Sequence, residues 1–285
     1  MNTYWVYENI TKQSSFYNKL DVLLLLCSSV LWKKHHPTFT TFLFCDELTL
    51  ELLIKLNATE LWDNIKLIEE NTKINKQIFW AASKVEQLKH IQEPTILLDH
   101  DLLVFRSLEE YIKETPLFAH DENGEMYYPT SHDKIIAQTE DIISRPKPLA
   151  VNCSFVYFPS PSFANLYANT SIKLMERFTE LEAPNSKYLI YAEQLTLKSL
   201  LDRESIEYNT LINEKWHCKE LKFEPNNKGI FSFEESQRYF RHYWLDKSKI
   251  KKSTEGFSFT EEIRILYNIL TPYKQLKLHH LDDTE

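Results

Sequence analysis

The chain has 285 residues, 43% of them hydrophobic and 26% charged, which is the composition of a folded protein with a large core and excludes a disordered chain. Its formal net charge of −8 gives no general attraction to nucleic acid or to an anionic membrane. The four cysteines, Cys27, Cys45, Cys153 and Cys218, form no C-x-x-C pair, which argues against a zinc knuckle and favours reduced thiols in a cytoplasmic protein.

The strongest candidate for a membrane span is the apolar run at residues 20–32. It is shorter than the roughly 20 residues that cross a bilayer, and Asp21 interrupts it, so we expect a buried helix and no transmembrane segment. Glu8 stands where a signal peptide would carry basic residues. Peripheral membrane contact through Lys33, Lys34 and the histidines that follow them stays open.

The first part of the chain alternates between strand and helix patterns. Short β-branched and aromatic runs predict strands at residues 3–7, 38–45, 65–68 and 95–98, and apolar runs at helical spacing predict helices at 16–32, 47–56 and 75–91. This β-α-β-α-β-α-β order implies parallel strands with helices on both faces of the sheet.

After residue 106 the pattern changes. A polar, turn-rich stretch at residues 121–148 precedes a predicted strand at 150–158, and further patterns predict helices at 163–181, 192–201 and 258–270 and a strand at 206–211. No linker interrupts the chain, so we expect one domain over residues 1–285. With only three glycines and neither G-x-x-x-x-G-K nor G-x-G-x-x-G, the chain has no glycine-rich phosphate loop.

Two aspartates, Asp99 and Asp101, directly follow the predicted strand at residues 95–98, and a second strand-like run begins at 102. In an extended backbone residues i and i+2 point to the same side, so both carboxylates can converge on one divalent cation or one metal-bound diphosphate. Strand ends are also where α/β proteins place ligands. A D-x-D on its own is more often a surface turn, so other motifs must support the metal site.

The order of the motifs resembles GT-A glycosyltransferases, and within them the family 8 enzymes (galactosyltransferase- and glycogenin-like) and related uncharacterised bacterial proteins. The motifs are D-x-D, an N-C-S strand at residues 152–154, an E-Q pair at 193–194 and H-Y-W-L-D-K at 242–247. The resemblance implies a GT-A (nucleotide-diphospho-sugar transferase) fold, with a Rossmann-like mixed central sheet flanked by helices. Residues 1–108 would be the nucleotide-binding half, 109–250 the acceptor and donor-sugar half, and 251–285 a C-terminal helix and tail.

The resemblance implies that Asp99, Asp101 and His242 hold Mn²⁺ or Mg²⁺ on the diphosphate of a nucleotide sugar. Oxygen ligands suit these cations, and the metal neutralises charge on the departing diphosphate. Lys247 or Lys249 would contact a phosphate oxygen, and the spacing of this chain leaves open which of the two does so.

Further positions match family residues that surround the donor. By resemblance, Lys84 faces the nucleotide sugar, Asn152 meets the donor sugar or the acceptor, and Glu193 and Gln194 lie on the reacting side of the sugar. A carboxylate or amide there stabilises an oxocarbenium-like centre during retaining transfer. For the base and ribose the matching residues are Tyr7 and Asn9. Each residue also has a structural alternative, such as a surface lysine or a strand-end asparagine.

The implied function is metal-dependent transfer of a hexose from a nucleoside diphosphate sugar, expected to be UDP-linked, with retention at the anomeric carbon. The acceptor would be a glycan, a lipid-linked glycan or a protein. One alternative is a nucleotidyltransferase, although its usual phosphate loop is missing. Another is a catalytically silent GT-A fold that serves in binding or as a scaffold, because Ser154 and Leu245 replace glycines of the family motifs.

Overall fold

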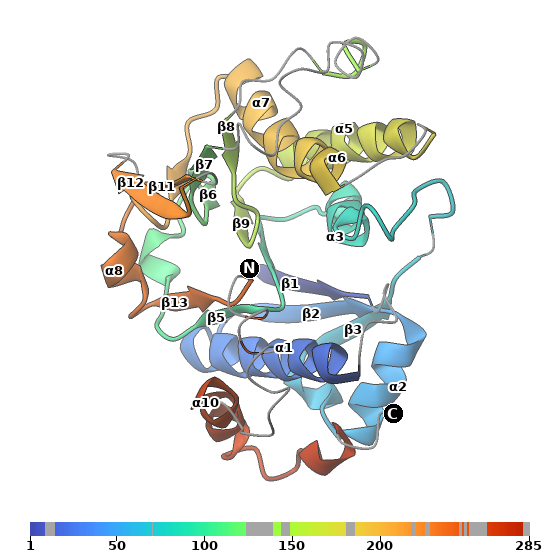
Figure 1. Ribbon diagram of the computed structural model, residues 1–285, viewed down its shortest axis with the longest axis vertical. Coiled ribbons are helices and arrows are strands. Elements are labelled where there is room, and N and C mark those ends of the chain that lie inside the picture. The colour runs from blue at the N-terminus through green and yellow to red at the C-terminus, as the bar shows by residue number, and fades with distance from the viewer. Residues whose placement is uncertain are drawn as a thin grey trace. The chain divides into compact units, whose positions relative to one another are not determined.

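The computed structural model of the chain is a mixed α/β structure with a mostly parallel central sheet flanked by helices (Figure 1). It describes residues 1–8, 15–69, 71–123, 139–143, 149–180, 186–217, 220–225, 229–244, 247, 250 and 261–281. The chain divides into two compact units. Unit 1 comprises Met1–Ile68, Leu98–Glu110 and Gln237–Glu285, and unit 2 comprises Glu69–Leu97 and Tyr111–Ser236. The predicted α/β class is confirmed, whereas the single domain over residues 1–285 stays a prediction.

Unit 1 contains three parallel strands in the order β1 (Asn2–Tyr7), β2 (Thr40–Cys45) and β3 (Asn64–Leu67). Every second residue of β1 is buried, as a half-covered strand requires. Helices α1 (Ser15–His35) and α2 (Glu47–Lys55) provide the crossovers that parallel strands need. Asp46 caps α2, because its Oδ1 accepts a hydrogen bond of 2.7 Å from the Thr49 amide. The predicted alternation of strand and helix is therefore confirmed in this unit.

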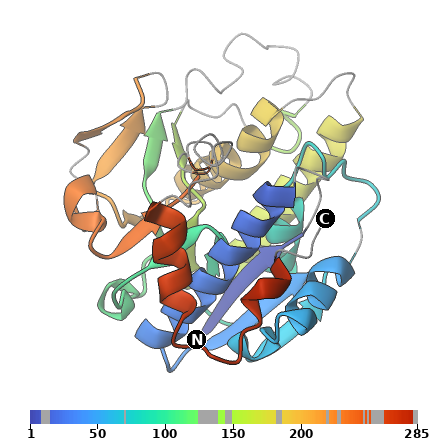
Figure 2. The same ribbon diagram turned by 60° about the horizontal axis from the view of Figure 1, so that its bottom comes forward.

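Helix α1 is the central helix of unit 1, and residues 20–32 are all buried, as its apolar sequence predicted. On the sheet side, Trp5 Nε1 donates to Ser28 Oγ over 3.0 Å. Figures 1 and 2 show α10 (Glu261–Leu270) beside α1, and Cys27 Sγ donates to the Leu266 carbonyl there. Among the described residues, no helix is long and apolar enough to cross a membrane.

A short antiparallel ladder in unit 1 joins β5 (Leu102–Val104) to β13 (Phe240–His242), with His242 opposite Leu102. The chain also forms three short 3-10 helices: η1 (Thr59–Leu61), η3 (Glu109–Tyr111) and η5 (Leu278–Leu281).

Unit 2 contains two groups of strands. The first has the order β10 (Asn209–Thr210), β6 (Leu117–Phe118), β9 (Phe155–Phe158) and β4 (Thr95–Leu98), of which β4 ends at the boundary with unit 1. The second has the order β12 (Lys222–Pro225), β11 (Glu214–His217), β7 (Asp121–Asn123) and β8 (Leu149–Val151). Two polar residues of β7, Asp121 and Glu122, are buried.

The helices of unit 2 gather around α5 (Pro161–Thr179), which begins where Ser160 Oγ accepts a hydrogen bond from the Phe163 amide. Around it lie α3 (Ala82–Gln87), η2 (Leu88–His90), α6 (Ser186–Ile190), the π-helical turn η4 (Tyr191–Leu195) and α7 (Thr196–Arg203). A last short helix, α8, spans Phe233–Ser236.

Four predicted elements of unit 2 differ from the structure. The predicted strand at residues 206–211 is reduced to the two residues of β10. The predicted strand at residues 150–158 is two strands, because Asn152 Oδ1 accepts the Ser154 amide over 3.0 Å and forms a turn between β8 and β9. The predicted helix at 75–91 begins only at Ala82, because Asn75 Oδ1 accepts the Gln77 amide in a preceding turn. The predicted helix at 192–201 is a π-helical turn followed by α7.

Candidate functional site

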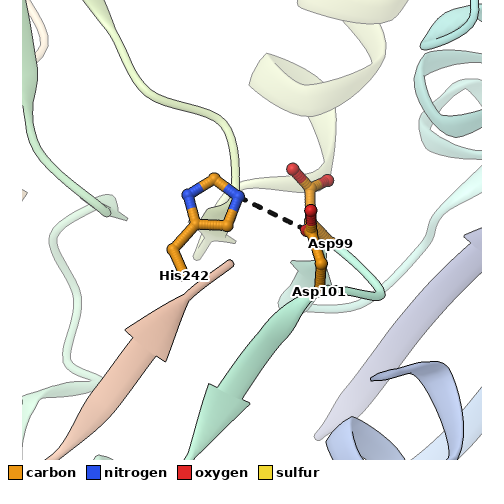
Figure 3. Close-up of side chains that lie close together, drawn as sticks. All are labelled: Asp99, Asp101 and His242. Atoms are coloured by element: carbon orange, nitrogen blue, oxygen red, sulfur yellow. Dashed lines mark ion pairs between the residues drawn. The ribbon is translucent and has the colours of Figure 1, made fainter. Parts of the chain in front are cut away.

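Asp99 and Asp101 lie in a turn that connects β4 to β5. The Asp99 carbonyl accepts a hydrogen bond of 3.1 Å from the Leu102 amide, so the backbone here is not the extended strand from which we predicted convergence. The two carboxylates nevertheless lie close together (Figure 3). The expected convergence is therefore found, but the turn produces it.

His242 reaches this turn through backbone pairing. It is the last residue of β13, stands opposite Leu102 in the ladder, and is followed by Tyr243, whose amide donates to the Asp101 carbonyl over 3.0 Å. A single register of the β5–β13 ladder thus fixes the imidazole beside the turn.

The nearest ligand atoms of Asp99, Asp101 and His242 all lie within 4.8 Å of one another. Figure 3 shows His242 directed toward the two carboxylates, with its Nε2 3.3 Å from Asp101 Oδ1. Ligands on opposite sides of one divalent ion are about 4 to 5 Å apart, so this spacing suits such an ion. Within the described part of the chain, the buried His242 Nδ1 has no hydrogen-bond partner. The two oxygen donors and one nitrogen donor fit a cation such as Mn²⁺ or Mg²⁺.

Lys247 follows His242 by five residues, its amide donates to the Tyr243 carbonyl over 2.9 Å, and its ammonium lies among the acids of unit 1. Its Nζ is 2.9 Å from Asp101 Oδ2 and 2.7 Å from Asp21 Oδ1. His100 Nε2 lies 3.1 Å from the same ammonium and 3.2 Å from Asp21 Oδ1. Asp21, Asp101 and Lys247 are only 8%, 5% and 7% exposed, so this is a buried ionic cluster.

The charges of this cluster fix its protonation. Burial alone would raise the pKa of Asp101, but the charge of Lys247, and after it those of His242 and His100, holds that pKa well below its usual value. Burial alone would lower the pKa of Lys247, but Asp101 and Asp21 raise it above its usual value. At neutral pH Asp101 is therefore a carboxylate and Lys247 an ammonium.

Unit 2 contains a second buried ionic contact. Lys84 on α3 lies 2.8 Å from Glu193 Oε1, and its Nζ also donates to the Cys153 carbonyl over 3.2 Å. Glu193 is 5% exposed and belongs to the π-helical turn η4, a kind of distortion that is frequent at functional sites. The amide oxygen of Gln194 is buried, and no described residue donates a hydrogen bond to it.

Asn152, at the end of β8, makes contacts of its own in unit 2. Its Nδ2 donates to Glu122 Oε1 over 2.7 Å, and the same carboxylate oxygen lies 3.2 Å from His120 Nε2. The side chain therefore closes the turn before Ser154, as the strand-end alternative expected, and it also holds a buried carboxylate in place. Its contact with the sugar or the acceptor stays a prediction.

The structure thus brings some of the predicted site residues into one cluster in unit 1 and into two separate contacts in unit 2. In unit 1 Asp99, Asp101, His242 and Lys247 come together, and Tyr7 contacts the same cluster, because its ring is 5.1 Å from that of His100. In unit 2 Lys84 contacts Glu193, whereas Asn152 contacts Glu122. Asn9 and Lys249 lie outside the described residues.

Four polar residues of these clusters were not predicted: Asp21, His100, Glu122 and His120. Asp21 had a sequence signal, since it is the one charge within the apolar run at residues 20–32, and such a charge requires a partner when the helix is buried. His100, Glu122 and His120 lie beside predicted motifs or strands, and only the fold shows that their side chains contact Lys247 or Asn152 or each other.

Comparison with solved structures finds similar glycosyltransferases. One is the galactosyltransferase LgtC in complex with donor and acceptor sugar analogues, at 11% identity and a TM-score of 0.40, covering 67% of this chain and 70% of that one. Another is the apo form of the glycosyltransferase GlyE of Streptococcus pneumoniae TIGR4, at 12% identity and a TM-score of 0.38, covering 74% of this chain and 45% of that one.

No curated protein sequence matches the chain. A family model does match, over residues 2–258, and its description is "Family of unknown function (DUF6734)". Because the match spans most of the 285 residues, the chain belongs to the DUF6734 family.

Proposed function

We propose that this protein is a metal-dependent glycosyltransferase of the GT-A type, similar to family 8, that moves a hexose from a nucleoside diphosphate sugar to an acceptor. The observation that carries the proposal is the convergence of Asp99, Asp101 and His242. Sequence motifs far apart in the chain predicted these three residues as ligands of one ion, and their ligand atoms lie within 4.8 Å of one another. An ordinary surface turn with two acids would give no reason for His242 to lie beside them.

The unit 1 cluster has the charges that binding of a diphosphate requires. A bound divalent ion would neutralise the charge that builds up on the departing diphosphate. Asp101 is held as a carboxylate, which is the form that ligates a metal ion. Lys247 supplies a permanent positive charge in the same cluster, and an ammonium can donate to several oxygens.

For the donor sugar we propose Glu193 and Gln194 as the residues next to the reacting carbon. Lys84 holds the Glu193 carboxylate in one orientation, and the buried Gln194 oxygen can face developing positive charge. Such groups suit retaining transfer, in which a cationic sugar centre forms while the diphosphate leaves and the acceptor enters on the same face of the sugar. Asn152 would contact the sugar or the acceptor, and its bond to Glu122 fixes its amide.

We propose UDP as the nucleotide, with Tyr7 and Asn9 contacting its base and ribose and Lys249 as a second candidate for the phosphate. The acceptor would be a glycan, a lipid-linked glycan or a protein. The spacing of the cysteines, typical of reduced thiols, favours action in the cytoplasm.

A thermal-shift experiment with nucleotides and nucleotide sugars, each with and without Mn²⁺, tests the proposal. A ligand at one hundred times its Kd stabilises the folded state by about 2.7 kcal/mol, which is about 4 to 5 °C in Tm for a chain of this size. We expect such a rise with UDP or a UDP-sugar only when Mn²⁺ is present, and we expect Asp101→Ala to abolish it.

Asp202→Ala, which removes a half-exposed carboxylate from α7 in unit 2, is the matched control and should leave the rise unchanged. Release of UDP from one UDP-sugar would then show transfer or hydrolysis. Pyrophosphate release from a nucleoside triphosphate would point to a nucleotidyltransferase instead, and donor binding without turnover to a silent GT-A fold. No response to any nucleotide would refute donor binding.

A further inference from the structure

Both oxygens of Asp101 are already in contact with nitrogen atoms. Oδ1 faces His242 at 3.3 Å, and Oδ2 faces the Lys247 ammonium at 2.9 Å. The Lys247 ammonium thus neutralises the Asp101 carboxylate, which the proposed function assigns to a divalent ion as a ligand. A metal ion that uses this carboxylate has to compete with Lys247 for it.

Asp21 gives the same ammonium a second carboxylate. The Lys247 Nζ lies 2.7 Å from Asp21 Oδ1, which is at least as close as its contact with Asp101. Asp21 comes from α1, near the start of a buried apolar segment, where an ionised side chain is costly unless it is paired. Lys247 therefore has a partner that is not one of the three proposed metal ligands.

The charges of the cluster suit an exchange of cations. The Lys247 ammonium shares its single positive charge between Asp21 and Asp101, so a divalent ion that takes Asp101 leaves the ammonium with Asp21. An ammonium that leaves Asp101 can stay on Asp21 and direct its other N–H groups to a phosphate oxygen.

We propose that Lys247 is a built-in cation that occupies Asp101 until a divalent ion displaces it, and that Asp21 is the positioning residue that retains the displaced ammonium. This proposal rests on the proposed function, since it requires a divalent ion at Asp99, Asp101 and His242. It adds that metal affinity is set by competition with a lysine of the same chain. No covalent step is involved.

Titration of the purified protein with Mn²⁺ alone tests this competition, with free Mn²⁺ measured by its electron paramagnetic resonance signal at fixed pH and salt. Lys247→Met removes the competitor, and we expect Mn²⁺ to bind at least tenfold more tightly, because close ion pairs of this kind contribute more than a factor of ten. Asp21→Asn leaves the ammonium with Asp101 alone, and we expect weaker Mn²⁺ binding.

The double variant Asp21→Asn/Lys247→Met separates competition from net charge. It loses one negative and one positive charge, so its net charge equals that of the wild type, and it leaves no lysine on Asp101. We expect it to bind Mn²⁺ at least tenfold more tightly than the wild type. It also avoids the buried, uncompensated Asp21 of the single lysine variant, so it remains informative if Lys247→Met does not fold.

The control is Lys33→Met, which removes a lysine from a partly exposed pair with Asp63 and should leave Mn²⁺ affinity unchanged. A double variant that binds Mn²⁺ no more tightly than the wild type overturns the competition while leaving the metal site intact. Weaker binding by Lys247→Met does the same, because the lysine would then support the site. Absence of Mn²⁺ binding in the wild type and in every variant overturns the proposed metal site and this proposal together.

Discussion

Replacing Lys247 by methionine should destabilise the protein strongly when no metal is present. The ammonium is 7% exposed and is the positive partner of Asp21 and Asp101, at 2.7 and 2.9 Å. Methionine fills a similar volume but leaves two buried carboxylates without that charge. Removing one member of a buried pair costs about 3 to 5 kcal/mol, because the remaining charge is desolvated and unpaired.

Urea unfolding at pH 7.5 in the presence of EDTA, followed by tryptophan fluorescence, measures this loss as a change in the free energy of unfolding. Asp21→Asn should cost less than Lys247→Met, because Lys247 keeps Asp101 as a partner. The double variant should recover a large part of the loss, since it removes opposite charges together. If the free energy of unfolding of Lys247→Met is within about 1 kcal/mol of the wild-type value, the cluster is effectively solvated and the reasoning fails.

Three other predictions concern separate parts of the chain. Burial lowers the pKa of His36 from 6.5 to about 4, and its Nε2 accepts a hydrogen bond from the Leu108 amide, so His36 is neutral in the folded protein. The free energy of unfolding should therefore fall by about 3 kcal/mol as the pH falls from about 6.5 to about 4, and urea unfolding of His36→Gln should show a smaller loss over that range. Ser28→Ala removes the hydrogen-bond partner of Trp5 Nε1 and of the Leu102 carbonyl and should lower the free energy of unfolding by about 1 to 3 kcal/mol in the same assay; an unchanged midpoint would contradict it. Gln194→Ala should lower kcat of sugar transfer by about a hundredfold with donor Kd nearly unchanged, whereas a change confined to donor Kd would assign it to binding.

The N-terminal alternation of strands and helices could be predicted because its signals are local. The strand at residues 95–98 was placed correctly, and the helix predicted at 16–32 was found as a slightly longer α1. Within a short stretch of sequence, periodicity and β-branched or aromatic runs indicate which side chains face a core. Those signals do not depend on what lies elsewhere in the chain.

The missed features depend on contacts between distant segments or on single polar residues. The antiparallel pairing of β5 with β13, which positions His242, joins segments more than a hundred residues apart and leaves no periodic signal in either. The break between β8 and β9 depends on one hydrogen bond from the Ser154 amide to the side chain of Asn152, inside a run that otherwise reads as one strand. The partner of Asp21 could be identified only after the fold had placed Lys247 beside α1.

The most direct measurement for the central claim is a crystal structure of the protein grown with Mn²⁺ and UDP, with diffraction data collected at the manganese absorption edge. The proposed function predicts one anomalous difference peak bonded to Asp99, Asp101 and His242, with diphosphate oxygens completing its coordination. A manganese peak elsewhere, or UDP bound with no metal at these three residues, would contradict it.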